Sequence, residues 1–362
     1  MRRRPVRSLV RDSVPVEGHI AYYNLWFRGH NNRRTAELLP RLSRVDPYLY
    51  LCPVRQPLRG VAYRSWRASR SRSDPLILSS LARRYRQLFS TDVNQIAYFD
   101  GDVVVDLDDP RYTEREYELL SRPGVRAFVV TGPRAAELYR QAGVTTPSEI
   151  VPQGVNLAGL VPEYVEAVAA AQRRSGTLVA GYVSSWLLTA GDRHGDRPTA
   201  NVDHLLELWD EVGTAVPEAE LWLLGEASRA VRELCAKRPS IRLFGRVPPG
   251  LVLAHVANFD VALYPRTADH GPGIRALKVT EYVAAGAPTV AYDFEATALV
   301  RESEAGVLVG DPHEFVAATI SLLRDPERRA ELAARGRAHG ALFSWDVLGA
   351  HYESLLDRYL PA

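Results

Sequence analysis

Lysine and cysteine are both scarce in this chain of 362 residues. Lysine occurs only at Lys237 and Lys278, so arginine provides nearly all of the basic side chains, a bias that we interpret as that of a GC-rich bacterial genome. Cysteine occurs only at Cys52 and Cys235, which lie far apart in the sequence. Two such cysteines exclude a disulfide framework and a zinc site and suit a reducing compartment, so we predict a cytoplasmic protein.

Long apolar segments are missing as well. The sequence contains no apolar run of about 18 residues, the length needed for a membrane-spanning helix. Residues 1–17 are rich in arginine but lack the apolar core of a signal peptide. We predict that residues 1–17 form a flexible arm, and a weak contact of this arm with an anionic membrane surface is the alternative, which would make the protein membrane-peripheral.

The overall charge is close to balanced. The formal net charge is +2, and hydrophobic residues make up 46% of the chain. Without a strongly basic block or a known binding motif, nucleic acid is excluded as the main partner. A chain of this length and composition can bury two full cores, so we expect two domains.

Short apolar stretches alternate with amphipathic segments along the chain, which indicates an α/β fold with parallel sheets. In the first half the pattern predicts a helix over 74–89 and strands over 95–99 and 103–107. In the second half it predicts strands over 178–183, 221–225, 241–245, 261–264, 288–292 and 306–309. The predicted domains are 18–157, a linker at 158–176, 177–342, and a last helix over 343–362.

A glycine-rich loop followed by a helix stands out in the second half. Gly271 and Gly273 come after a predicted strand, and a helix is expected from Ala276 to Ala285, closed by Gly286. Ligands of open α/β sheets bind at the carboxyl ends of the strands, and a helix N-terminus attracts anions. Lys278 would add a positive charge there, and Glu281, three residues on, could accept hydrogen bonds from a ribose diol. Taken alone, these two side chains also fit an ordinary surface helix.

The whole segment carries more information than the two side chains. Residues 276–291 read ALKVTEYVAAGAPTVA. This run resembles the donor-binding segment of retaining glycosyltransferases of family 4, written P-L-K-x-x-E-Y-x-A-x-G-x-P-V-V-A, and departs from it only at Ala276 and Thr289. The resemblance implies a GT-B fold, in which two Rossmann-like, doubly wound domains face a cleft and the C-terminal helix crosses back to the first domain.

Further stretches resemble the same family in the expected order. Residues 150–156 (IVPQGVN) are similar to its hinge turn, and residues 241–247 (IRLFGRV) to the strand whose following loop faces the nucleotide base. The resemblance therefore implies donor-binding roles in the C-terminal domain and, for Lys278, a catalytic one. The residues to which it gives donor-binding roles are Glu281, Thr280, Arg275, Gly271, Gly273, Gly245, Arg246 and Val247.

In the N-terminal half the resemblance is mostly architectural. Asp106, Asp108 and Asp109 follow a predicted strand and resemble the family's Y-D-x-x-D segment. Asp106 is the candidate for the acceptor site, whereas Asp108 and Asp109 suit a site or a turn equally well. His30 lies in a loop that in the family faces the interdomain cleft, and is a further catalytic candidate beside the simpler interpretation of a loop histidine.

Two positions depart from the family pattern. Many members have a second glutamate eight residues before the one matched by Glu281, but Gly273 stands there in this chain. Members also place cations after the first strand of the second domain, where this chain has Ser185. Arg193 or Arg197, in an inserted loop, could contact the donor diphosphate instead, or could simply be solvated.

The expected function is transfer of a sugar from a nucleotide sugar to an acceptor hydroxyl of a glycan, a lipid-linked saccharide or a natural product. Family resemblance implies retention of the anomeric configuration, no cofactor and no obligatory metal. The alternatives are a catalytically silent relative that binds a nucleotide or a partner enzyme, and a nucleotide-sugar epimerase. A pyridoxal-dependent phosphorylase is disfavoured, because neither lysine lies in a suitable sequence.

Overall fold

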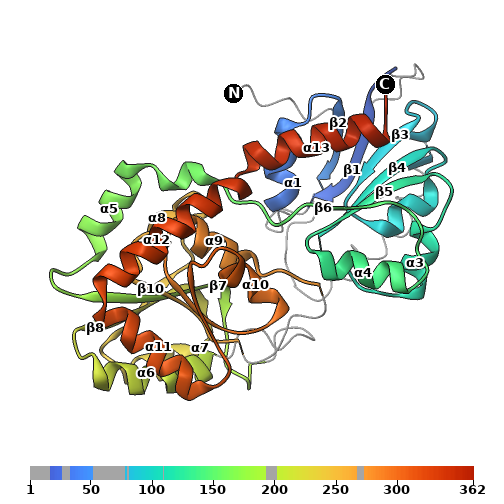
Figure 1. Ribbon diagram of the computed structural model, residues 1–362. Coiled ribbons are helices and arrows are strands. Elements are labelled where there is room, and N and C mark those ends of the chain that lie inside the picture. Colours follow the sequence, from blue (N-terminus) through green and yellow to red (C-terminus); the bar gives the residue numbers. More distant parts are fainter. Residues whose placement is uncertain are drawn as a thin grey trace. The chain divides into compact units, whose positions relative to one another are not determined.

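The computed structural model describes residues 17–26, 33–51, 78–79, 81–108, 110–192, 202–266 and 273–362. The chain forms two compact units. Unit 1 combines the residues up to Pro152 with the C-terminal segment Trp345–Ala362, and unit 2 is the continuous segment Gln153–Ser344. Each unit contains one six-stranded sheet whose neighbouring strands all run parallel (Figure 1).

The sheet of unit 1 has the strand order β2-β1-β3-β4-β5-β6. Its strands are β1 (Ile20–Trp26), β2 (Val45–Leu51), β3 (Gln87–Ser90), β4 (Asp102–Leu107), β5 (Val125–Val130) and β6 (Ser148–Ile150). The helices whose bounds lie within the described residues are α1 (Arg33–Leu38), α3 (Glu114–Leu120), α4 (Pro133–Gln141) and α13 (Trp345–Tyr359), with 3₁₀ turns η1 (Leu39–Arg41) and η2 (Val93–Tyr98).

Alternate residues of the unit 1 strands pack on opposite faces of the sheet, as the strand pleat requires. On one face, Val105 and Phe128 join an apolar cluster with buried residues of α3 and α4. On the other face, Val104 and Val129 join a cluster that α13 completes (Figure 1). The residues that α13 contributes are Trp345, Leu348, Tyr352, Leu355 and Leu356. The last helix is therefore part of the core of unit 1, as expected for a helix that crosses back.

Two predictions for unit 1 are wrong. The predicted helix over 74–89 ends earlier, because Gln87–Ser90 is strand β3, whose Leu88 and Phe89 pack on opposite faces of the sheet. The predicted strand over 95–99 is instead the 3₁₀ turn η2, which Asp92 caps by accepting a hydrogen bond from the backbone N–H of Asn94. In both cases a short apolar run was consistent with either structure, and the tertiary packing decides.

The sheet of unit 2 has the order β12-β11-β10-β7-β8-β9. From the central pair, β7, β8 and β9 run outward on one side and β10, β11 and β12 on the other, which is the strand order of dinucleotide-binding folds. The strands are β7 (Leu178–Leu187), β8 (Ala219–Ala227), β9 (Ile241–Gly245), β10 (Val261–Tyr264), β11 (Thr289–Tyr292) and β12 (Gly306–Val309).

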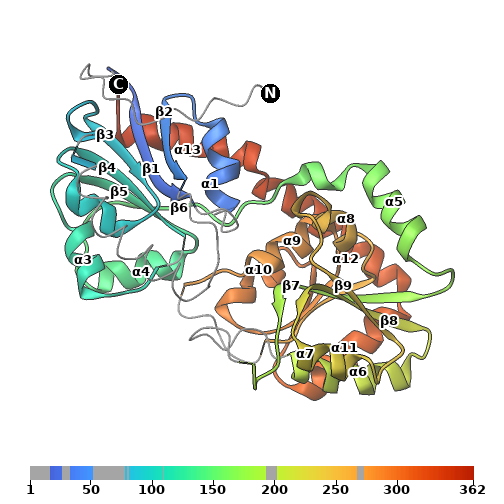
Figure 2. The ribbon, with the colours of Figure 1, turned by 180° about the vertical axis from the view of Figure 1, so that it is seen from behind.

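Helices cover both faces of this sheet. In Figures 1 and 2, α8, α9 and α12 lie on one face and α6, α7 and α11 on the other. The helices are α5 (Pro162–Gln172), α6 (Val202–Ala215), α7 (Arg229–Cys235), α8 (Val252–Val256), α9 (Leu277–Ala285), α10 (Ala298–Glu302), α11 (Pro312–Arg324) and α12 (Pro326–Gly340). The 3₁₀ turns are η3 (Leu157–Leu160), η4 (Pro249–Leu251), η5 (Glu295–Thr297) and η6 (Ala341–Phe343).

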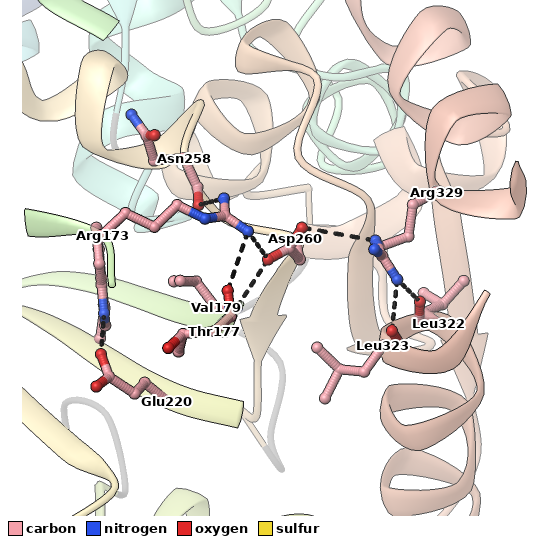
Figure 3. A network of polar contacts seen from close by, with 10 residues as sticks. Arg173, Thr177, Val179, Glu220, Asn258, Asp260, Leu322, Leu323 and Arg329 are labelled. Atoms are coloured by element: carbon pink, nitrogen blue, oxygen red, sulfur yellow. Dashed lines mark hydrogen bonds and ion pairs between the residues drawn. The ribbon is translucent and has the colours of Figure 1, made fainter. Parts of the chain in front are cut away.

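A network of ion pairs ties the helices to the amino-terminal edge of the central strands of unit 2 (Figure 3). Asp260, directly before β10, accepts a hydrogen bond from the backbone N–H of Val179 in β7 at 2.7 Å. Its carboxylate also pairs with Arg173, at the end of α5, and with Arg329 of α12 at 3.7 Å. The network fixes one edge of the sheet and leaves the carboxyl ends of the strands for other roles.

The segment predicted as a linker, 158–176, is structured. It contains η3 and α5, both of which contact α8, and it belongs to unit 2. The alanine-rich stretch with Pro162 at its start is a good helix former, and the polar composition reflects a helix with one exposed face. No helix in the described part of the chain is both long enough and apolar enough to cross a membrane.

Candidate functional site

The central strands of unit 2 separate toward their carboxyl ends. β7 and β10 pair only at Ala180 with Val261 and at Gly181 with Ala262, whereas β7 continues to Leu187. Beyond these pairs β10 stays with β11 and β7 stays with β8. This is the point where the connections leave in opposite directions, and ligands of open α/β sheets bind there.

Tyr282 fills part of the space between the separating strands. The side chain is fully buried, and its hydroxyl oxygen accepts a hydrogen bond from the backbone N–H of Val183 in β7 at 2.9 Å. Val183 lies past the last β7–β10 pair, so the hydroxyl takes the place of the missing strand partner. Burial, and then the nearby Tyr182 and Glu281, raise the pKa of Tyr282 well above its usual value, so the phenol stays protonated.

Lys278 lies at the start of α9, close to the point where β7 and β10 separate. Its Nζ atom lies 5.5 Å from the centre of the Tyr182 ring, a distance at which a cation is attracted to the ring face. Among the residues that the structure describes, Lys278 makes no ion pair with a carboxylate. The ammonium group therefore lies beside β7 just past its last pair with β10, with its charge not neutralised by a described neighbour, which suits an anionic ligand.

Glu281 and Thr280 are buried, at 4% and 3% exposure. Glu281 lies close enough to Tyr282 for its charge to help raise the pKa of that tyrosine. Both residues thus belong to the part of α9 that packs on the sheet. The ribose-binding role that the resemblance implies for Glu281 stays a prediction, and the structure adds a packing role.

Gly225 allows β8 to approach the end of β7. Its φ is +140°, and an added Cβ would lie 1.8 Å from the carbonyl oxygen of Ser184, so no side chain fits. Ser184 is buried, and the next residue, Ser185, is exposed at the carboxyl end of β7. The structure therefore places Ser185 near the expected donor position, but without a charge.

The loop before α9 has a left-handed residue where many relatives have glutamate. Gly273 has φ +74°, a conformation that side-chain-bearing residues rarely adopt. Arg275, two residues on, pairs with Glu302 at 2.8 Å and with Glu295 at 3.6 Å. Arg275 thus attaches this loop to η5 and α10, and its predicted donor-binding role stays a prediction.

Another group of predicted residues lies at the end of β9. Gly245 has φ +66°, which turns the chain, and Val247 packs partly against the core. Arg246 is exposed, and its guanidinium lies 5.6 Å from the centre of the Trp186 ring of β7. The turn thereby brings a cation and an aromatic ring together at the carboxyl edge of the sheet.

Asp106 is fully buried in unit 1. Its side chain is 0% exposed in unit 1, and it accepts a hydrogen bond from Nε of Arg34 at 2.8 Å. Arg34 also donates to Tyr352 Oη at 2.6 Å and to the carbonyl oxygens of Val151 and Pro152. Burial alone would lower the pKa of Arg34, but Asp106 holds it above its usual value. Asp106 thus belongs to a buried network of unit 1, and its predicted acceptor-site role stays a prediction.

Several predicted site residues lie outside the described residues, namely His30, Asp109, Arg193, Arg197 and Gly271. Asp108 lies at the end of β4, and its charge contributes to the raised pKa of Arg34. Within the described ranges, no group of three or more histidine, cysteine, aspartate or glutamate side chains is placed to bind a metal ion. The prediction that no metal is required stays a prediction.

The contacts of Tyr182, Trp186 and Tyr282 were not predicted from the sequence. Tyr282 belongs to the quoted motif, but its hydrogen bond to β7 depends on a tertiary contact. A signal was present in the stretch GYVSSW (181–186), where aromatic residues follow a predicted strand end. Aromatic side chains at that edge are candidates to line a ligand site.

Comparison with known sequences finds a similarity between part of unit 2 and a family of glycosyltransferases. A sequence model of the family described as Glycosyl transferases group 1 matches residues 185–325. A GDP-mannose-dependent monoacylated α-(1-6)-phosphatidylinositol monomannoside mannosyltransferase of Corynebacterium glutamicum is 27% identical over 169 residues. That match spans 44% of this chain and 44% of the relative, so it concerns less than half of either protein.

Comparison with solved structures identifies the fold. The sucrose-phosphate synthase of Thermosynechococcus elongatus superposes with a TM-score of 0.66 at 14% identity, covering 94% of this chain and 99% of that one. The Anabaena protein HepE in complex with UDP-glucose gives a TM-score of 0.68 at 13% identity, with coverage of 94% and 100%. The predicted GT-B fold and the predicted resemblance to glycosyltransferases are both confirmed.

Proposed function

We propose that this protein, whose residues 185–325 match the sequence model of the family Glycosyl transferases group 1, transfers a sugar from a nucleoside diphosphate sugar to an acceptor hydroxyl, with retention of the anomeric configuration. Unit 2 binds the donor at the carboxyl ends of β7 and β10, and unit 1 binds the acceptor. The observation that carries the proposal is Lys278, placed over Tyr182 where the two strands separate.

The chemistry follows from the leaving group. When the bond between the sugar and the diphosphate breaks, negative charge develops on the diphosphate oxygens. A fixed cation and the N-terminus of α9 stabilise that charge, and such preorganised charges are commonly the largest contribution to catalysis. α9 is held in place for this purpose by Tyr282 and by its left-handed C-cap Gly286, at φ +72°.

The acceptor belongs to one of three classes: a glycan, a lipid-linked saccharide or a natural product. The corynebacterial relative is named for a mannosyl transfer to a phosphoinositol lipid, and HepE is crystallised with UDP-glucose. These names support a sugar donor carried on GDP or UDP. A cytoplasmic location, with a weak membrane contact for a lipid-linked acceptor, fits this proposal.

The test is a donor screen. The purified protein is incubated with a panel of GDP- and UDP-sugars, alone and with acceptor candidates, and nucleotide release and product anomers are measured. Lys278→Ala should reduce turnover at least about tenfold, as expected for loss of a charged contact. Lys237→Ala, which removes the other lysine from an exposed site after α7, is the matched control and should leave turnover unchanged.

The departures at Gly273 and Ser185 favour one alternative, a silent relative that binds a nucleotide without turnover. Nucleotide binding without hydrolysis or transfer for any donor would support that alternative. Isolation of an isomerised sugar nucleotide would support an epimerase. Absence of binding to every nucleotide tested would overturn the proposed function itself.

A further inference from the structure

Three polar or aromatic side chains lie close to the carboxyl ends of the neighbouring strands β7, β8 and β9. They are Trp186 of β7, Glu226 of β8 and Arg246 after β9, and these three strands are neighbours in the sheet. The group lies on the half of the sheet away from β10, to one side of Lys278. A site of this kind would contact a different part of the donor from the diphosphate.

The strand register places two of these side chains on the same face of the sheet. Trp186 is the direct partner of Glu226, and Leu187 is the partner of Ala227. Leu187 and Ala227 are buried at 0% and 8%, whereas Trp186 is half-buried and Glu226 is exposed. Because successive residues of a strand point to opposite faces, Trp186 and Glu226 share the face that is not packed.

Arg246 is drawn to the same face by its contact with the Trp186 ring at 5.6 Å. Within the described part of the chain, Arg246 pairs with no carboxylate and Glu226 pairs with no cation. Other arginines of unit 2 behave differently: the exposed Arg229 pairs with Glu233 at 2.7 Å, and the half-buried Arg238 pairs with Asp210 at 2.7 Å. An acid and a base thus flank one aromatic ring without neutralising each other.

We propose that Trp186, Glu226 and Arg246 form a binding site for a guanine base, so that the donor is a guanosine diphosphate sugar. This inference rests on the proposed function, because it assigns the base of the same donor. The indole offers a ring face for stacking, and the two charged side chains recognise the base edge.

Guanine is the base whose edge fits this pair of charges. Its N1–H and N2–H₂ groups are adjacent donors, which the two oxygens of the Glu226 carboxylate can accept together. Its O6 and N7 atoms are adjacent acceptors, which a guanidinium such as that of Arg246 recognises with two hydrogen bonds. Base stacking on an aromatic side chain adds about 1–3 kcal/mol regardless of the base.

The other common bases fit less well. Uracil has one ring N–H between two carbonyl oxygens, so a carboxylate that accepts from the N–H places its second oxygen against an acceptor. Adenine has an acceptor, N1, beside its amino group and meets the same conflict. A site with one carboxylate and one guanidinium therefore selects guanine by leaving the polar atoms of the wrong base or of the protein unpaired.

The test compares three nucleotides that differ only at the base. Affinities for GDP, IDP and UDP are measured by calorimetry with the full chain. IDP lacks the N2 amino group of GDP, so its base offers one hydrogen-bond donor fewer to Glu226. We expect GDP to bind at least about tenfold more tightly than UDP and several-fold more tightly than IDP, which corresponds to the 1–3 kcal/mol of a paired contact.

Two variants assign the preference to a residue. Glu226→Gln should weaken GDP binding about tenfold without weakening UDP binding, and abolish the difference between GDP and IDP. Glu233→Gln, a matched change at an exposed glutamate of α7, should alter none of these affinities. Arg246→Ala should weaken GDP binding while the melting temperature of the free protein stays the same, because the side chain is exposed.

The outcomes separate this inference from the proposed function. Tight binding of UDP with weak binding of GDP would overturn the guanine site while leaving sugar transfer intact. A GDP preference that persists in Glu226→Gln, with GDP and IDP still distinguished, would also overturn it. Failure of all three nucleotides to bind would overturn the guanine site together with the proposed function.

Discussion

The backbone N–H of Val183 donates a hydrogen bond to the hydroxyl oxygen of Tyr282 at 2.9 Å, and so joins the middle of β7 to the middle of α9. The bond lies where β7 has lost its partner β10. One phenol therefore holds the strand end that carries Ser184 and Ser185 against the helix that carries Lys278. The spacing of these groups depends on that contact.

Tyr282→Phe removes the hydroxyl and keeps the ring. It should lower the free energy of unfolding by about 1–3 kcal/mol, because the N–H of Val183 loses its acceptor. It should also weaken nucleoside diphosphate binding, since β7 is no longer fixed to α9. Denaturation and calorimetry measure the two effects. Tyr292→Phe, which removes a hydroxyl bonded to His204 at 2.9 Å, is the matched control and should affect stability alone.

Lys278→Gln tests whether the ammonium group contacts the diphosphate of the ligand. If the ammonium contacts the diphosphate, the variant should lose about 10- to 100-fold in affinity for a nucleoside diphosphate, and much less for the unphosphorylated nucleoside. Calorimetry with both ligands measures the ratio. Equal losses for both ligands would place Lys278 at the base or ribose instead.

Gly273→Glu introduces the side chain that many relatives carry at this position. We expect no gain of activity and a loss of stability of about 1 kcal/mol or more, because φ is +74° and a residue with a Cβ is strained there. Thermal melting and turnover of the same preparation test this. A variant with higher turnover and unchanged melting would show that the loop readily adopts another conformation.

Asp106→Asn separates a structural role from a catalytic one. Loss of the buried charge beside Arg34 should destabilise unit 1 by about 3–5 kcal/mol, as for other buried pairs that lose one partner. Asp102→Asn, in the same strand but in an exposed pair with Arg126, should cost at most about 1 kcal/mol. If Asp106→Asn abolished turnover and left denaturation unchanged, the predicted acceptor-site role would be favoured.

His255 gives unit 2 a defined dependence on pH. Its side chain is 8% exposed and lies against Phe244, and burial lowers its pKa, opposed by the bond from its Nδ1–H to the carbonyl of Leu251. A lowered pKa means that the unfolded chain takes up a proton first as the pH falls. Stability is therefore complete above the unfolded pKa of about 6.5 and is lost as the pH falls through the folded pKa.

Denaturation at several values between pH 8 and pH 5 measures this effect. His255→Gln removes the titrating ring and should flatten the decline relative to the wild type. His351→Gln, at an exposed position of α13, is the control and should leave the decline unchanged. A decline that is the same in all three proteins would assign it to other groups.

The sequence predicts unit 2 better than unit 1, for a physical reason. Strands over 241–245, 261–264 and 306–309 have the predicted bounds, and α9 ends at Gly286 as expected. These elements have strong punctuation from glycine and proline, which acts locally. No glycine or proline occurs between residues 76 and 100, where the predicted helix over 74–89 should end and the predicted strand over 95–99 should begin, and there long-range packing determines the structure.

For the candidate site, the positions of the residues in the loop and helix were easier to predict than the side chains with which they pair. The positions of Lys278 and Gly273 beside α9 follow from a loop–helix pattern, which is a local property. The pairing of Arg275 with Glu302, and of Asp106 with Arg34 across 72 positions of sequence, depends on which segments meet in space. No local pattern encodes that choice, so a charged residue in a motif can have a packing role.

The division of unit 1 between two ends of the chain determines the order in which the protein can be completed on the ribosome. Its face formed by Tyr22, Val104 and Val129 is covered by α13, which is translated after unit 2. Unit 2 is continuous, so all of its residues are translated before α13 emerges from the ribosome. Unit 1, whose translation begins first, is therefore completed after unit 2. A nascent chain stalled before residue 345 should contain a protease-resistant unit 2 and a protease-sensitive unit 1. The exposed apolar face of unit 1 should bind chaperones until α13 is released.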